Sequence, residues 1–138
     1  MIRTRHLVVM LTLMLATARV TFAQEGVEKL LGQYLFPPEL VMQHQQKIEL
    51  KPAQRAAITE AIQQVQARVV ELQWRIQEEA QKLSELVQAP SPNEEAVLAQ
   101  VDRVLATERE IKRAHMTLLV RIKNALTREQ QNALKALR

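Results

Sequence analysis

The sequence predicts an all-α protein built on a long antiparallel helical hairpin. Its 138 residues include only 2 Gly and 3% aromatic residues, and the helix formers Ala, Leu, Gln, Glu, Lys and Arg dominate. No stretch has the alternating, β-branched pattern of a strand. Between residues 52 and 125, apolar residues recur at helical spacing on both sides of Pro90 and Pro92. Prolines are not tolerated inside a helix, so two long helices with a turn at these prolines are expected.

Residues 1–23 are predicted to be a secretory signal peptide. Arg3 and Arg5 precede an apolar run over residues 7–15, and small residues suit a cut after Ala23. The alternative is an N-terminal membrane anchor, but Arg19 interrupts the apolar run. We therefore expect an exported protein with one helical domain over residues 24–138.

Loss of the signal peptide changes the charge argument. Removing Arg3, Arg5 and Arg19 lowers the formal net charge from +4 to +1. The high isoelectric point therefore owes much to a segment that the mature protein lacks, and a nucleic-acid role loses its main support. The absence of cysteine excludes disulfides, thiolate metal sites and cysteine nucleophiles.

The mature chain is expected to begin with a short, mixed segment before a first helix. Residues 24–32 could form a helical turn or stay disordered, whereas Tyr34 to Phe36 should dock on the fold. Pro38 and Glu39 suit the first turn of a helix predicted over residues 38–49. Pro52 then opens the first long arm, predicted over residues 52–87.

Each long arm has an apolar seam. In the first arm the seam residues are Ile58, Ile62, Val65, Val69, Leu72, Ile76, Leu83 and Leu86. In the second they are Val97, Val101, Val104, Ile111, Leu118 and Ile122. Beside them lies a second row whose members are spaced by multiples of seven residues: Leu98, Leu105, Leu119 and Leu126. Two rows at seven-residue spacing predict coiled-coil-like packing of the arms.

Capping boxes mark the last two helices. Ser91 and Glu94 predict the start of a second arm over residues 92–125, and Thr127 and Gln130 predict a final helix over residues 128–137. The sequence therefore predicts four helices, of which the first and last are short and the middle two are long.

A thin hairpin of this length leaves apolar flanks that its own helices cannot cover. Val70 and Trp74 lie off the first arm's seam, and Met116 and Val120 lie off the second's. Such flanks suggest a twofold homodimer, and the alternative is a monomer with scattered apolar surface.

The segment from Leu126 to Gln130, Leu-Thr-Arg-Glu-Gln, resembles the L-T-x-x-Q motif of the periplasmic Spy/CpxP family. Leu50 to Gln54 stands where the first copy belongs, with Lys51 in place of threonine. The order of helices is also similar over nearly all of the mature chain. Because Lys51 offers no acceptor, the departure weakens the first cap but leaves Leu50 and Gln54 in place.

The resemblance implies a curved, cradle-like dimer in the periplasm. Members of that family hold unfolded or stressed envelope proteins without ATP or regulate envelope stress, and related members respond to zinc, nickel or cobalt. Basic groups can attract clients and apolar groups can hold them. Our candidates for attraction are Arg103, Arg109, Arg113 and Arg121, and those for holding or dimerisation are Val70, Trp74, Met116 and Val120. The alternative is a solvated face with local pairs to Glu108 and Glu110.

Metal binding is the sharper alternative function. His115 lies on the second arm's seam in this reading, and it could ligate zinc, nickel or cobalt with His44 or Glu60 at the open end. Neither histidine has a second ligand four residues on, as metal-sensing relatives do. The simpler reading is that His115 and Glu108 set the register of the arms.

Enzymatic activity has no support in the sequence. It contains no Gly-rich phosphate loop, G-x-S-x-G or H-E-x-x-H motif. Membrane-surface binding also has weak support, because the polar faces are mixed in sign rather than basic, and we expect no stable membrane insertion.

Overall fold

The computed structural model describes residues 29–138, and the predicted signal peptide with the first residues of the mature chain lies outside them. Residues 29–32 form a helical turn in a unit that ends at Gln33, and Tyr34–Arg138 forms a second compact unit. Among the described residues there is no strand, which confirms the all-α class.

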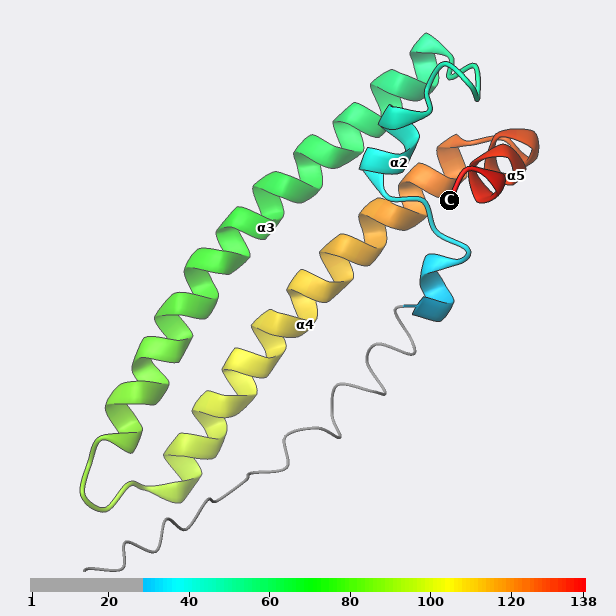
Figure 1. Cartoon of the computed structure of the whole chain (residues 1–138). Coiled ribbons are helices and arrows are strands. Elements are labelled where there is room, and N and C mark those ends of the chain that lie inside the picture. Colours follow the sequence, from blue (N-terminus) through cyan, green and yellow to red (C-terminus); the bar gives the residue numbers. More distant parts are fainter. Residues whose placement is uncertain (1–28) are drawn as a thin grey trace, which may run out of the picture. The chain divides into compact units, whose positions relative to one another are not determined.

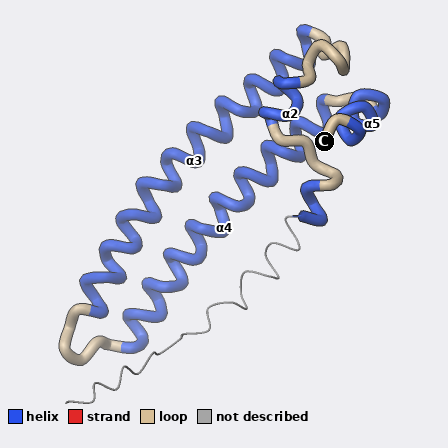
Figure 2. Tube along the Cα trace, in the orientation of Figure 1, coloured by secondary structure: helices blue, strands red, loops and turns tan. Residues whose placement is uncertain are grey.

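The second unit is dominated by two long helices that pack against each other (Figure 1). In chain order its helices are α2 (Pro38–Gln43), α3 (Pro52–Val87), α4 (Glu94–Ala125) and α5 (Arg128–Ala136). The 36 residues of α3 make a rod about 54 Å long. A short turn joins α3 to α4 at one end, here called the tip, and α2 and α5 lie at the other, the open end (Figure 2).

The predicted first arm, residues 52–87, is confirmed, but the first helix is shorter than predicted. It ends at Gln43 instead of Glu49, and residues 44–49 form a series of turns. The chain must reverse here before Pro52 can open α3. Glu49 adopts a left-handed conformation with a φ of 51°, and the Leu50 N–H donates to the Gln45 carbonyl at 2.9 Å.

The prediction that Ser91 caps the second arm is wrong. The helix begins at Glu94, and the Asn93 side chain accepts from the Ala96 N–H at 2.9 Å. Asparagine is as good a cap as serine, and this start leaves both Pro90 and Pro92 in the turn. Glu94 therefore occupies the first helical position, where its carboxylate faces the positive end of the dipole.

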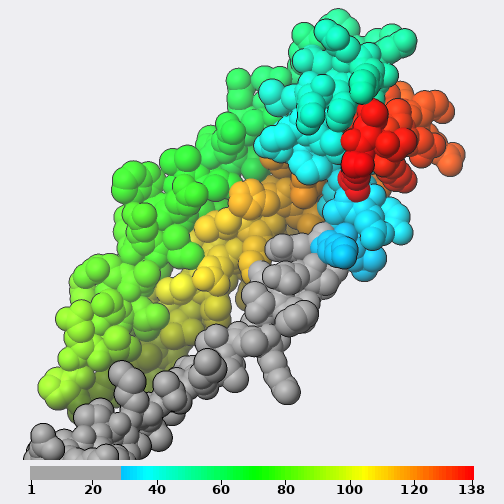
Figure 3. All heavy atoms as spheres, in the orientation of Figure 1, coloured from blue at the N-terminus to red at the C-terminus, as the bar shows by residue number. Residues whose placement is uncertain are grey.

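The core lies at the open end. It comprises Phe36, Val41, Ile48, Ile58, Ile122, Leu126 and Leu134. Phe36, Val41, Ile122 and Leu134 are fully buried. Figure 3 shows the segment before α3 and the C-terminal α5 massed together here. The predicted docking of the segment around Phe36 is thus confirmed.

The contact row of α4 differs from the predicted one. The valine row from Val97 to Val104 is half-buried as predicted, but Leu98 and Leu105 are 55% and 49% exposed. Gln100 and Thr107 are buried in their place. The contact with α3 therefore lies on the other side of the valine row, where the side chains are polar or small.

Candidate binding surface

The two L-T-x-x-Q-like segments meet at the open end through their glutamines. Gln54 Nε2 donates to Gln130 Oε1 at 2.8 Å, and Gln130 Nε2 donates back to Gln54 Oε1 at 3.0 Å. Gln54 also donates to the Ala125 carbonyl at 2.8 Å, and Gln130 to the Ile48 carbonyl at 3.1 Å. One amide pair thereby links two segments that are far apart in sequence, residues 48–54 and residues 125–130.

Each glutamine also closes the start of its own helix. Gln130 Oε1 accepts from the Thr127 N–H at 2.9 Å, and Thr127 Oγ1 accepts from the Gln130 N–H at 3.2 Å, which confirms the predicted capping box. At the other copy, Gln54 Oε1 accepts from the Lys51 N–H at 3.0 Å. Lys51 makes no side-chain cap bond, as its lack of an acceptor requires. The motif leucines, Leu50 and Leu126, both contact the core. These residues are structural.

An ion cluster bridges the middle of the hairpin. Glu110 of α4 accepts from Arg68 at 2.6 Å and from Arg75 at 3.1 Å, both on α3. Arg68 also pairs with Glu71 at 2.6 Å, and hydrogen bonds to Glu71 and Glu110 raise its pKa. The alternative interpretation, in which Glu110 forms local pairs on its own helix, is not what the structure shows, because α3 supplies its salt-bridge partners.

A second polar contact lies nearer the tip. Buried Gln100 donates through Nε2 to the Glu79 carboxylate at 2.6 Å and to the Glu79 carbonyl at 2.9 Å. Lys82 reaches the same carboxylate at 3.2 Å. The hydrogen bonds from Gln100 and Lys82 lower the pKa of Glu79 below its ordinary value.

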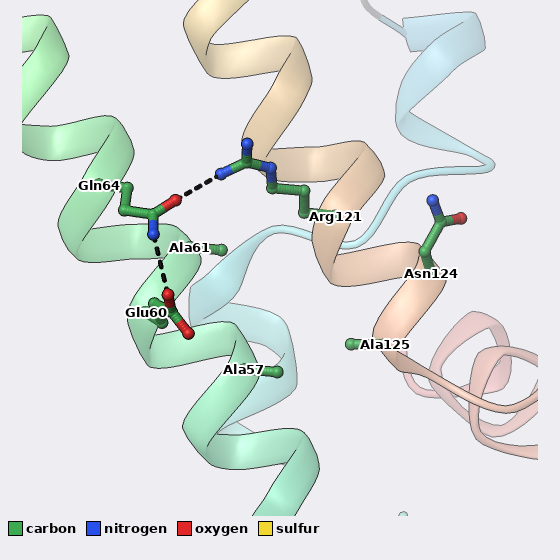
Figure 4. Close-up of a pocket in the computed structure, with 7 residues that line it drawn as sticks. All are labelled: Ala57, Glu60, Ala61, Gln64, Arg121, Asn124 and Ala125. Carbon is green, nitrogen blue, oxygen red and sulfur yellow. Dashed lines mark hydrogen bonds between the residues drawn. The ribbon is translucent and has the colours of Figure 1, made fainter.

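A shallow hollow of about 370 Å³ lies over the seam near the open end (Figure 4). Its floor is formed by small residues, Ala57, Ala61 and Ala125. Along one rim, Arg121 donates to Gln64 Oε1 at 2.8 Å, and Gln64 Nε2 donates to Glu60 Oε1 at 2.9 Å. This relay uses Arg121 to hold α4 against α3 and leaves it less free to attract a client.

The four candidate arginines separate into two groups. Arg103 and Arg121 face α3: Arg121 bonds Gln64, and the charge of Arg103 helps to lower the pKa of Glu79. All four are exposed, but Arg109 and Arg113 lie on the side of α4 that faces away from α3. None of the four makes a salt bridge in the part of the chain that the structure describes.

Arg109 and Arg113 share one side of α4 with two of the apolar candidates. Arg109, Arg113, Met116 and Val120 follow one another at steps of four, three and four, which places them on a single stripe. Met116 and Val120 are 37% and 42% exposed. Leu118, two residues from each, contacts the core, so this stripe points away from α3. We call these four residues the α4 outer stripe.

The other apolar candidates lie on the opposite edge of the hairpin. Val70 and Trp74 are 52% and 66% exposed. Leu72, between them, is fully buried, so both side chains point away from α4. We call Val70 and Trp74 the α3 outer edge. The predicted exposed flanks are therefore two surfaces that face in opposite directions.

The predicted metal ligands do not come together. His115 and Glu108 are exposed instead of lying on the seam, because the contact row of α4 passes through Thr107, Ile111 and Leu118. Neither His44 nor His115 lines the hollow beside Glu60. Within residues 29–138 no group of three His, Asp or Glu side chains is arranged to hold a metal ion.

Sequence reasoning missed the polar contacts across the hairpin. Arg68 and Arg75 are seven apart, as are Gln100 and Thr107, so their periodicity could have marked them. A search that considers only apolar residues does not find contact rows made of polar side chains.

Comparisons with protein-family models, curated proteins and solved structures gave no match. Among the described helices, none is both long and apolar enough to cross a bilayer.

Proposed function

We propose that this chain is an ATP-independent periplasmic chaperone of the Spy/CpxP type, which holds unfolded or stressed envelope proteins. The observation that carries the proposal is the α4 outer stripe, where two cations that make no salt bridge with any described residue are followed by two exposed apolar side chains. A holding surface needs this mixture, because charge speeds encounter and apolar contact slows release. The proposal also draws on the resemblance of the two motif copies.

We further propose that the α3 outer edge forms the dimer contact. Trp74 is large, aromatic and 66% exposed, which is typical of a residue buried by a partner. Val70 and Trp74 lie one turn apart on the same edge of α3, so a twofold axis running along α3 there would bring the same patch of two copies together, with both open ends on one side. The α4 outer stripe would then remain free on each side of the dimer, completing a four-helix cradle.

The proposal is tested with residues 24–138, which include the whole compact unit Tyr34–Arg138. The wild type should suppress aggregation of an unrelated unfolding protein at near-stoichiometric ratio without ATP. Met116→Gln with Val120→Gln should weaken suppression and leave the sedimentation mass unchanged. Val70→Gln with Trp74→Gln should lower the mass to that of a monomer.

Leu98→Gln with Leu105→Gln is the matched control, since it makes the same chemical change on another exposed row of α4. Equal loss of suppression in this control would contradict the assignment to the outer stripe. No suppression by the wild type, together with a metal-dependent rise in melting temperature, would favour a heavy-metal sensor, because a ligand of the native state stabilises it.

A further inference from the structure

The open end carries a cluster of cations around an exposed aromatic ring. The ammonium groups of Lys123 and Lys135 lie 6.0 and 5.9 Å from the centre of the Tyr34 ring. Arg138 lies 5.2 Å from the ring of Phe36, two residues on, and donates to the Leu35 carbonyl. Tyr34 is 52% exposed, so the ring and its lysines form part of the surface.

These cations are not paired with a carboxylate of any described residue. In the described part of the chain, every salt bridge lies within the hairpin, and none involves Lys123, Lys135 or Arg138. Between residues 118 and 138 the bases are Arg121, Lys123, Arg128, Lys135 and Arg138, whereas Glu129 is the one acid. The C-terminal portion of the unit is therefore strongly basic.

The tip has the opposite charge. Residues 76–102 contain the acids Glu78, Glu79, Glu85, Glu94, Glu95 and Asp102 and a single base, Lys82. Because the tip and the open end lie at opposite ends of two helices about 54 Å and about 48 Å long, the charges are separated along the hairpin (Figure 1). The two signs of charge that each helix face carries are thus separated along the length of the hairpin, with the acids nearer the tip and the bases nearer the open end.

We propose that the open end docks on an anionic membrane surface, with the hairpin standing away from it. Lysines attract anionic phospholipid headgroups, and an exposed tyrosine suits the interface between headgroups and acyl chains. The acidic tip would be repelled by the same surface, which sets the orientation. Since no described helix can span a bilayer, the contact is peripheral.

A membrane explains the composition of the cluster better than an acidic protein does. The cluster combines two lysines with a tyrosine ring that is 52% exposed. A tyrosine suits the interface between headgroups and acyl chains, whereas an acidic protein would need only the charges. The proposal is independent of client binding, because the α4 outer stripe contains none of these residues.

The test uses residues 24–138 and vesicles of phosphatidylcholine with or without about one third phosphatidylglycerol. Flotation should show binding to the anionic vesicles that falls as salt rises. Lys123→Glu with Lys135→Glu should weaken binding by about 25-fold or more, since each lysine near such a surface contributes about fivefold. Lys82→Glu with Lys112→Glu makes the same change in net charge on the hairpin and should leave binding nearly unchanged.

Orientation can be read from tryptophan fluorescence, because Trp74 is the single tryptophan. Its emission should not shift on binding, whereas Tyr34→Trp in a Trp74→Phe background should shift to the blue. Equal losses in the two charge variants, or no binding to anionic vesicles, would overturn the proposal. Binding to soluble polyglutamate but not to vesicles would overturn it in favour of an acidic protein partner. None of these outcomes depends on suppression of aggregation.

Discussion

The open end and the tip of the hairpin are held together in different ways. At the open end, Phe36, Ile122 and Leu134 are fully buried in one apolar core, and two glutamines bond each other reciprocally. Between residues 73 and 99 no side chain of the hairpin is fully buried, and Leu83 and Leu86 are half-buried. The tip depends more on its polar contacts, such as Gln100 with Glu79. Stability is therefore concentrated at one end, which leaves the long outer surfaces free to bind.

The largest difference should come from removing apolar volume at each end. Ile122→Ala should lower the free energy of unfolding by about 3 kcal/mol, because Ile122 is fully buried in the core. Leu83→Ala, at a half-buried site near the tip, should cost about 1 kcal/mol. Urea denaturation measures both changes in the free energy of unfolding. Equal losses would contradict the view that stability is concentrated at the open end.

The glutamine pair should have the next largest effect. Gln130→Ala removes donors or acceptors from Gln54, Thr127 and the Ile48 carbonyl. Leaving such groups without partners in a partly buried site should cost about 2 kcal/mol. Asn132→Ala, at an exposed position of the same helix, is the control for helix propensity. A denaturation midpoint equal to that of the control would mean that the pair does not tie the open end together.

Thr127→Ala should cost about 1 kcal/mol, because it removes the cap of α5 while Gln130 keeps its long-range bonds. The same urea titration measures it. An unmoved midpoint would contradict the role of Thr127 as a cap.

The smallest effect should be a pH dependence at the tip. The lowered pKa of Glu79 means that its carboxylate is stabilised in the folded state, so this stability is present above the ordinary value of 4.5 and is lost as pH falls through the folded value. Glu79→Gln should therefore be less stable than the wild type at neutral pH, and the difference should shrink in acid. Melting curves between pH 7 and about 3 measure it. Glu78→Gln serves as control, since Glu78 makes no side-chain hydrogen bond among the described residues, and a constant Glu79→Gln deficit at all pH values would contradict the assignment.

The sequence specified the long elements better than it specified their contacts. Both ends of α3 were predictable, because Pro52 suits the first position of the helix and the prolines after Val87 cannot be accommodated in its interior. The start of α4 was not, since Ser91 and Asn93 are both good caps and the position of two prolines decides between them. Apolar periodicity favoured the row of Leu98 and Leu105, yet α3 packs on the side where Gln100 and Thr107 make close contact possible.

The candidate surface was predictable as residues but not as an arrangement. Exposure of Trp74 and Met116 followed from their distance from the seam. That they face opposite ways depends on which row of each helix is buried, which the sequence left open. The pairing of Gln54 with Gln130 spans the whole hairpin, so local patterns carry no information on it.

Amide hydrogen exchange on residues 24–138 tests the contrast between the two ends most directly. Local opening should be easier at the tip, so amides of residues 76–87 and 94–104 should exchange about a hundredfold faster than those of residues 58–65 and 118–126. That result would support a fold anchored at its open end with a weakly held tip. Uniform protection along α3 and α4 would contradict it, because the hairpin would then open as one cooperative unit.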